Sequence, residues 1–295
     1  MEFKKLTEFQ RLKLKWKDFE AYQDYKFHRA ISNKPLVNIG HTFKEITHFK
    51  HSGHSGDIIY SLPAVFALAK NGLAHLHLQS QQAGNYQKAY HPLGNVMLNE
   101  KAIQLLQPLL LHQPKIAVCD FYGTQAIDYD LDFVRKFPMK QTRGSISRWY
   151  FHVFGIYANL SMPWLTAPKD EAFADHIVIS RSHRYRAPGI DYMFLRKYQK
   201  KIFIGVPEEF EDMKKQLPDL QYVQVKDFLE MASIINGCRL FIGNQSFPFS
   251  IAEALKVNRL LEVYYKAPNV IVEGEGGHDF LYQEHFEKAV EVLYK

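Results

Sequence analysis

The sequence predicts an α/β protein of two domains, each built on a parallel sheet, that face a central cleft. The chain has 295 residues, about twice the roughly 150 residues of a typical domain. Hydrophobic residues make up 46% and charged residues 23%, which excludes disordered, collagen-like and coiled-coil architectures. Short apolar runs alternate with helical patterns, and such alternation requires crossover connections between parallel strands.

Cysteine content and hydropathy indicate the compartment. The two cysteines, Cys119 and Cys238, exclude a disulfide scaffold and fit a reducing environment. Charges interrupt every short apolar stretch in the first twenty residues, unlike a secretory signal. The chain also lacks a run of about 18 apolar residues, so we expect no membrane span. These observations predict a cytoplasmic protein.

The N-terminal segment predicts a basic amphipathic helix. Apolar residues recur there every three or four positions: Phe3, Leu6, Phe9, Leu12, Trp16, Phe19 and Tyr22. Net charge is +6, and residues 1–50 hold eleven Lys and Arg against six acids. Two interpretations stay open: a helix packed on its domain with a solvated basic face, or a contact with a polyanion or with the inner membrane face.

Residues 1–165 form the predicted first domain, on the acceptor side of the cleft. Residues 45–50 resemble a strand, 51–56 a Gly-rich turn and 57–72 a helix in which Pro63 predicts a kink. Further strands are expected at 75–79 and 115–121, with a broken helix at 99–111 between them.

Residues 166–277 form the predicted second domain, after a boundary marked by Pro163 and Pro168. Strands are expected at 176–180, 201–206, 221–225, 239–243 and 259–265, and helices at 208–217, 227–237 and 247–257. Residues 273–280 suggest a Gly-rich connection. Residues 278–295 predict a helix that packs back across the domains.

The segment from His51 to Asp57 lies at a strand-to-helix junction. Its members before Asp57 are His51, Ser52, Gly53, His54, Ser55 and Gly56, and we expect them to contact the acceptor or to hold the loop itself. The segment matches neither a Walker A loop nor a dinucleotide fingerprint. Asp57 can cap the helix or accept a proton from an attacking hydroxyl, and both interpretations stay open.

A second junction leads the strand at 239–243 into a helix through Gly243, Asn244, Gln245 and Ser246. Small polar residues and unpaired N–H groups at a helix start can hold a diphosphate. The alternative is an ordinary capped helix with Ser246 as N-cap and Pro248 in its first turn.

Two basic clusters accompany these junctions. Arg181, Ser182, Arg184 and Arg186 follow the strand at 176–180, where arginines would neutralise phosphates or form an exposed charged loop. The first domain carries Arg135, Lys136, Lys140, Arg143 and Arg148, and we place Lys140 and Arg143 on the acceptor side.

We expect no metal site. His51 and His54 are too few ligands for one. Asp128, Asp130 and Asp132 alternate, which indicates one face of a strand.

Two motifs together resemble the lipopolysaccharide heptosyltransferases of glycosyltransferase family 9. Residues 56–64, Gly-Asp-Ile-Ile-Tyr-Ser-Leu-Pro-Ala, are similar to the Gly-Asp segment that opens these enzymes. Residues 241–252 are similar to the family's Ile-Gly-Asn-Asp-Ser-Gly-Pro-Met-His-Leu-Ala segment. The resemblance implies a GT-B fold of two Rossmann-like domains.

The resemblance also implies roles. Asp57 matches the catalytic base, and Ser246 with its neighbouring backbone matches the donor-phosphate contact. Arg181 and Arg184 fall in a loop that carries groups for the diphosphate. The implied reaction moves a sugar from a nucleoside-diphosphate sugar to an acceptor hydroxyl, without a metal or other cofactor. Gln245, Phe247 and Ser250 depart from the family pattern, so donor identity is not carried over.

The acceptor stays open between a glycan, a lipid-linked saccharide and a hydroxylated base in DNA. The three departures at the donor motif also leave two further functions open. One is a non-catalytic module that binds a sugar nucleotide, and the other is an epimerase or hydrolase acting without an acceptor. One fold hosts many activities.

Overall fold

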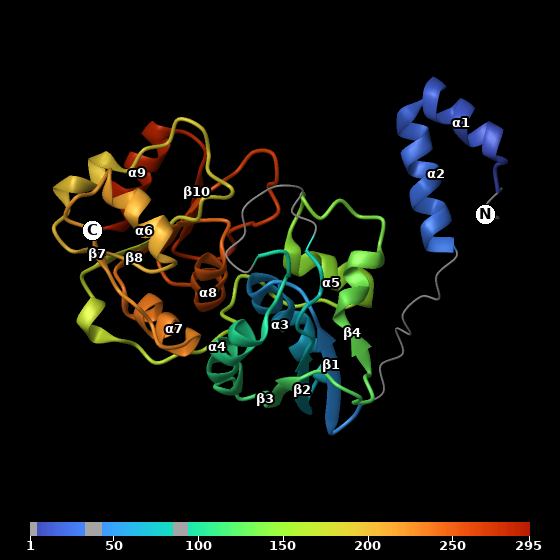
Figure 1. Ribbon diagram of the computed structural model, residues 1–295, viewed down its shortest axis with the longest axis horizontal. Helices are drawn as coiled ribbons and strands as arrows, with labels where there is room; N and C mark the ends of the chain where they lie inside the picture. Colours follow the sequence, from blue (N-terminus) through green and yellow to red (C-terminus); the bar gives the residue numbers. More distant parts are fainter. Residues whose placement is uncertain (1–4, 33–42, 85–93) are drawn as a thin grey trace.

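The computed structural model describes residues 5–32, 43–84 and 94–295, and its two parallel sheets confirm the predicted α/β architecture (Figure 1). The sheets lie in separate parts of the chain, one before residue 131 and the other after residue 176.

The first sheet has the order β3-β2-β1-β4. Its strands are β1 (Ile46–His51), β2 (Leu73–Leu78), β3 (Ile116–Phe121) and β4 (Tyr129–Asp130). Alternate residues of β1 are buried, as expected where one face of a strand is packed. The helices are α3 (Ser55–Ala69), α4 (Glu100–Leu111) and α5 (Ile146–Phe154), with a 3-10 helix at Leu131–Lys136. The sequence had not indicated α5.

The second sheet has the order β10-β9-β8-β5-β6-β7. Its strands are β5 (Ile177–Ser180), β6 (Lys201–Phe203), β7 (Gln221–Tyr222), β8 (Leu240–Asn244), β9 (Arg259–Glu262) and β10 (Gly277–Phe280). The helices are α6 (Pro207–Lys214), α7 (Phe228–Gly237) and α8 (Phe247–Leu255), with 3-10 helices at Glu171–Phe173 and Met193–Lys197.

Strand β10 corrects the expectation of a connecting loop at 273–280. Gly274 and Gly276 have positive φ angles of 82° and 68°, so the turn ends before the strand begins. From Gly277 the chain pairs with β9 in continuous register. The glycines made the whole segment resemble a turn, whereas only its first part is one.

The two domains share a hydrophobic core. Helix α3 packs against α8, and α4 packs against α7. One cluster of buried residues includes Phe49 and Ile58 of the first domain together with Phe249 and Ile251 of the second. The indole N–H of Trp164 also donates to the carbonyl of Ile59 at 3.1 Å. Helices that follow strands of both sheets thus pack directly on one another.

The C-terminal helix α9 (Gln283–Leu293) packs on the second sheet. Its Phe286 stacks on Phe280 of β10, with ring centroids 4.0 Å apart. Phe286 also contacts the rings of Tyr192 and Phe194. This packing lies within the second domain, whereas the sequence had suggested a helix that spans both domains.

The N-terminal segment forms two helices, α1 (Glu8–Lys17) and α2 (Phe19–Ser32), where one was predicted. Asp18 separates them in an extended conformation, and its carboxylate accepts from the N–H of Ala21 at 2.9 Å, as a helix cap does. In Figure 1 the pair lies to one side of both sheets. The predicted helical residue Phe3 lies outside the described part of the chain. Across residues 5–32, 43–84 and 94–295, no helix meets the length and hydropathy of a membrane span.

Candidate active site

The two sheets each reverse strand order at one point, and the predicted motifs lie there. In the first sheet β2 and β4 flank β1 on opposite sides, and in the second β6 and β8 flank β5. Parallel α/β sheets bind ligands in the crevice outside such a point, at the carboxyl ends of the strands. The segment 51–57 follows β1, and residues 181–186 and 245–246 follow β5 and β8.

Asp57 lies in the first turn of α3 and closes that turn. Its Oδ2 accepts from the backbone N–H of His54 at 3.3 Å and lies 3.2 Å from Nδ1 of the same residue. Burial raises the pKa of Asp57, but the hydrogen bond and charge of His54 and the charge of Arg135 outweigh burial and lower it below its usual value. With 30% of its side chain exposed, Asp57 is an ionised carboxylate at the edge of the protein interior.

His51 and Gly53 lie close to the carboxylate of Asp57. The ring of His51 is fully buried, with Nε2 2.8 Å from the hydroxyl of Tyr150 and Nδ1 accepting from the Gly53 N–H at 2.9 Å. Burial lowers the pKa of His51 to about 4, so the ring is neutral at pH 7. His51 therefore holds the loop, which is one of the two roles expected for this segment.

Ser52 is fixed by a buried acid that the sequence analysis had assigned only to a strand face. Asp132 accepts from the backbone N–H and the hydroxyl of Ser52 at 2.9 and 2.7 Å. Arg135 pairs with Asp132 at 2.6 Å and donates to the Ser52 hydroxyl at 2.5 Å. Ser52 is thus engaged within the protein, while Ser55 is buried at the start of α3.

Arg135 and Asp57 converge over Gly53. A β-carbon on Gly53 would lie 2.9 Å from Nη1 of Arg135 and 3.1 Å from Oδ2 of Asp57. The charged ends of both residues therefore occupy the same small region. The sequence had placed Arg135 only in a general basic cluster.

The remaining predicted basic residues of the first domain lie farther along the chain. Lys140 and Arg143 are exposed and joined in a turn, in which the Arg143 N–H donates to the Lys140 carbonyl at 3.1 Å. Asn269 of the second domain donates to the carbonyl of Gln141 at 2.9 Å. The loop that carries the two cations is thus attached to the second domain.

The structure brings the two motifs into contact. A β-carbon on Gly56 would lie 3.8 Å from both the Cα of Phe247 and the Oγ of Ser250. Gly56 precedes Asp57, and Phe247 begins α8. The start of α3 and the start of α8 therefore pack together across the two domains.

Arg181 lies within the protein rather than toward a donor. It is 3% exposed, and its guanidinium donates to both carboxylate oxygens of Glu262 at 2.6 and 2.8 Å. It also lies over the ring of Tyr192. The two N–H groups with which an arginine would bind phosphate are thus already bonded to Glu262. We therefore do not include Arg181 in the candidate donor site.

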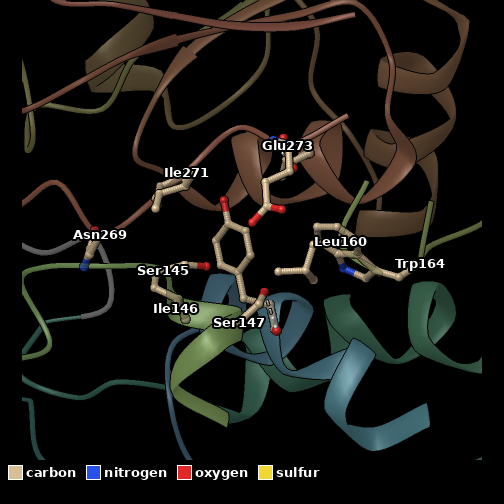
Figure 2. Close-up of a pocket in the computed structure, with 11 residues that line it drawn as sticks. Ser145, Ile146, Ser147, Leu160, Trp164, Asn269, Ile271 and Glu273 are labelled. Atoms are coloured by element: carbon tan, nitrogen blue, oxygen red, sulfur yellow. Dashed lines mark hydrogen bonds between the residues drawn. The ribbon is translucent and has the colours of Figure 1, made fainter. Parts of the chain in front are cut away.

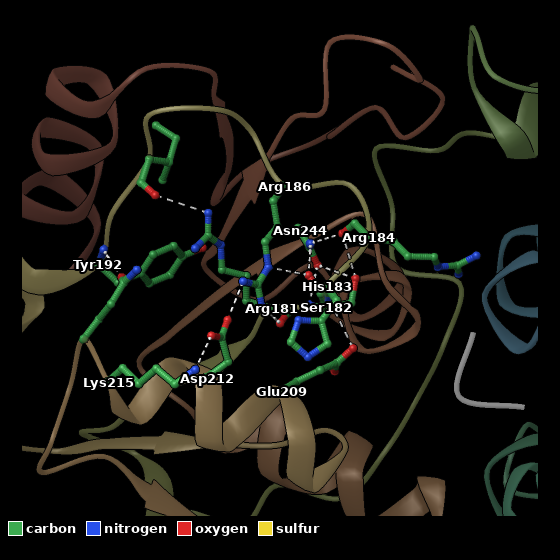
Figure 3. Close-up of polar contacts among 12 residues, drawn as sticks. Arg181, Ser182, His183, Arg184, Arg186, Tyr192, Glu209, Asp212, Lys215 and Asn244 are labelled. Atoms are coloured by element: carbon green, nitrogen blue, oxygen red, sulfur yellow. Dashed lines mark hydrogen bonds and ion pairs between the residues drawn. The ribbon is translucent and has the colours of Figure 1, made fainter. Parts of the chain in front are cut away.

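Asn244 organises the loop after β5. It is fully buried, accepts from the Ser182 N–H at 3.0 Å and donates to the carbonyls of Ser182 and Arg184 at 3.0 and 2.6 Å. The Ser182 hydroxyl donates to the Arg184 carbonyl at 2.9 Å. Figure 3 shows the side chain of Arg184 leaving this cluster, while that of Arg186 points into it and that of Arg181 extends toward Tyr192. Asn244 and Ser182 thus position Arg184.

The second donor segment is also partly structural. Gln245 is 7% exposed, and its amide donates to Ala267 and Asn269 at 2.6 and 2.7 Å. Gly243 leaves no room for a side chain, because a β-carbon there would lie 2.8 Å from the Ser180 carbonyl. Ser246 is the N-cap residue of α8, but its side chain makes no capping hydrogen bond. The N–H groups at the start of α8 thus lack the usual side-chain cap.

Sequence reasoning missed several residues that shape the site. Glu262 holds Arg181, and Asn269 joins the domains through its bond to Gln141. Glu209, which accepts from the His183 N–H at 3.3 Å, has a pKa that burial raises to about 7. Glu262 is the one acid within the strand-like run 259–265, and this was an available signal for it. Glu209 and Asn269 follow no motif.

A small cavity lies between the domains, apart from Asp57. Ser145, Leu160 and Glu273 line it (Figure 2), as does Tyr60, whose hydroxyl is buried without a hydrogen-bond partner. Among residues 5–32, 43–84 and 94–295, no group of three or more His, Cys, Asp or Glu is arranged to hold a metal ion.

No family model matches the chain, and no curated protein is similar to it. Solved structures are similar in fold. A glycosyltransferase of family 9 from Veillonella parvula covers 86% of this chain and 98% of its own, with a TM-score of 0.54 and 13% identity. E. coli heptosyltransferase WaaC with ADP covers 84% and 99%, with a TM-score of 0.58 and 10% identity.

A third similar structure is E. coli ADP-heptose lipopolysaccharide heptosyltransferase II, which covers 85% of this chain and 98% of its own at a TM-score of 0.54 and 10% identity. Each likeness extends over nearly the whole of the solved chain. The chain therefore has the two-domain GT-B-type fold of the family 9 glycosyltransferases.

Proposed function

We propose that this protein is a glycosyltransferase that moves a sugar from a nucleoside-diphosphate sugar to an acceptor hydroxyl. The observation that carries the proposal is the meeting of two loops at the points where strand order reverses. Gly56, next to the ionised Asp57, packs on Phe247 and Ser250 at the start of α8. An acid and a helix N-terminus thus lie on opposite sides of one interface, as transfer between two substrates requires.

In this proposal Asp57 is the general base. The acceptor oxygen forms a bond to the anomeric carbon, the bond from that carbon to the diphosphate breaks, and the acceptor proton passes to Asp57. The lowered pKa of Asp57 makes the carboxylate a weak base before transfer. Its partly exposed side chain can receive an acceptor, and His54 and Arg135 maintain its ionised form.

The leaving diphosphate would lie between Arg184 and the N-terminus of α8. A helix N-terminus favours negative charge, and Ser246 leaves the first N–H groups of α8 without a side-chain cap. Cationic side chains and helix ends, rather than a metal ion, support the leaving group here. Because the similar WaaC structure holds ADP, we take an ADP-sugar as the first donor to test.

The test is Asp57→Asn, which keeps the shape of the side chain and removes the base. We expect donor binding to stay unchanged by calorimetry, while transfer, followed as release of nucleoside diphosphate, falls by about 10²- to 10⁴-fold. Asp279→Asn, an exposed acid on β10, is the matched control. Undiminished transfer by Asp57→Asn would remove Asp57 from the mechanism.

The acceptor remains a glycan, a lipid-linked saccharide or a hydroxylated base in DNA. The exposed Lys140 and Arg143 could bind a phosphate group on any of these acceptors. Salt separates them, since binding to duplex DNA weakens steeply with rising salt through counterion release. A small phosphorylated glycan would respond much less.

A second candidate is a non-catalytic module that binds a sugar nucleotide. It is favoured by Gln245 and Ser250, which depart from the family motif: the Gln245 amide donates to the Ala267 carbonyl, and the Ser250 hydroxyl donates to the Phe247 carbonyl of its own helix. Calorimetry with a panel of nucleoside diphosphates and their sugars distinguishes the two. A test for nucleotide release then follows: binding with neither hydrolysis nor transfer to any acceptor would favour the module, and transfer would favour the enzyme.

A further inference from the structure

Helix α1 carries an apolar stripe that is exposed to solvent. The stripe consists of Phe9, Leu12 and Trp16, whose exposed fractions are 75%, 53% and 88%. Spacings of three and four residues place the three side chains on one face of the helix. None of the residues of α1 is buried. Aromatic and aliphatic side chains this exposed mark a contact surface.

The stripe faces away from α2. Helices α1 and α2 pack on each other, and the Leu6 N–H donates to the Tyr25 hydroxyl at 3.1 Å across the pair. Leu14, on the opposite side of α1 from Leu12 by the helical period, is less exposed than the stripe. The fold of the helix pair therefore does not require Trp16.

Basic residues border the stripe. By the period of the helix, Lys13 and Lys17 lie along one side of the stripe and Lys15 along the other, and all three are exposed. Helix α1 holds four basic residues and one acidic residue. An apolar band with cations on both sides is the arrangement of a helix that lies in the surface of a membrane.

We propose that the stripe docks this protein on an anionic lipid bilayer. Phe9, Leu12 and Trp16 enter the boundary between headgroups and acyl chains, while the lysines contact the negative headgroups. A second copy of this chain fits less well, because apposed stripes would bring like charges together. Nucleic acid fits less well because its phosphates would meet the lysines and leave the most exposed aromatic side chains without a partner.

This surface is independent of the catalytic proposal, since no residue of the stripe belongs to the candidate active site. A phosphatidylcholine vesicle, with or without phosphatidylglycerol, is the probe. We expect the full chain to sediment with the mixed vesicles, more weakly at high salt because the electrostatic part is screened. Emission from Trp16 should shift to the blue as its ring leaves water.

Variants separate the apolar and the charged parts of the contact. Trp16→Glu should weaken vesicle binding at least about tenfold, because burial of a large aromatic side chain is lost. The combined Lys13→Gln, Lys15→Gln and Lys17→Gln variant should lose the preference for anionic vesicles, with about fivefold weaker binding for each lysine removed. Tyr157→Glu is the matched control, since Tyr157 is 78% exposed outside the helix pair.

As a control, circular dichroism is used to check that each variant retains its helices. Vesicle binding that Trp16→Glu leaves unchanged would overturn the proposal, as would a lack of binding to phosphatidylglycerol vesicles. Self-association in light scattering that Trp16→Glu abolishes, without vesicle binding, would assign the stripe to a second copy. Duplex DNA binding that depends on the lysines, without vesicle binding, would assign it to nucleic acid.

Discussion

Gly53 is the residue on which the candidate acid and its cationic neighbour depend. A β-carbon there would lie 2.6 Å from Cε1 of His51, in addition to its close approach to Arg135 and Asp57. The ring of His51 cannot retreat easily, because Tyr150 and the Gly53 N–H hold its two nitrogens. The requirement for glycine comes from this close approach and not from a positive φ angle.

We therefore expect Gly53→Ala to lower the free energy of unfolding by about 1–3 kcal/mol, as overpacking does, and to reduce transfer by moving Asp57. Urea denaturation measures the first effect and nucleotide release the second. Gly123→Ala is the control, since the nearest atom to its β-carbon would be 3.6 Å away. Equal stability of the two variants would contradict this expectation and would show that the loop can move to accommodate the added methyl group.

At the scale of elements, the pair of Arg181 and Glu262 joins the carboxyl ends of β5 and β9, which flank β8. Glu262 also accepts from the Tyr192 hydroxyl at 3.0 Å and from the Ala187 N–H at 2.7 Å. Both members of the pair are buried. The strand ends beside the candidate donor loops are thus held by one charged network.

Arg181→Met should cost about 3–5 kcal/mol in urea denaturation, because it leaves the carboxylate of Glu262 buried and unpaired. Lys215→Met removes the exposed partner of Asp212 and should cost at most about 1 kcal/mol. If Arg181→Met instead kept its stability and lost donor binding, Arg181 would return to the donor site.

At the scale of the molecule, the shared core couples the two domains. The contacts of α3 with α8 and of α4 with α7 bury apolar residues of both domains in one cluster. Loss of either domain would expose the apolar surface of the other, at about 25 cal/mol for each Å². The site between the domains depends on that coupling.

We expect the two domains to unfold in one transition. Trp149, which is 8% exposed, reports on the first domain by fluorescence, and circular dichroism reports on both. The two signals should change at the same temperature, with equal calorimetric and van't Hoff enthalpies. Two resolved transitions would show that each domain is stable alone.

The sequence by itself determined most of the strands, most of the helices and the two motifs. Apolar runs such as the one within 239–243 are local and strongly patterned. A glycine or serine after such a run marks a strand-to-helix junction, whatever the arrangement of the domains. The same local rules failed at 273–280, where glycines of a turn concealed β10. They also failed at Asp18, which divides a continuous apolar pattern into two helices.

Only the tertiary structure decided which charged residues are engaged. Arg181 and Arg184 look alike in the sequence, but Glu262, 81 residues from Arg181, lies beside one of them. Asp132 and Arg135 likewise reach Ser52 from about 80 residues away. A charge acquires its role from the partners that folding brings within hydrogen-bond distance, and no local pattern contains those distances.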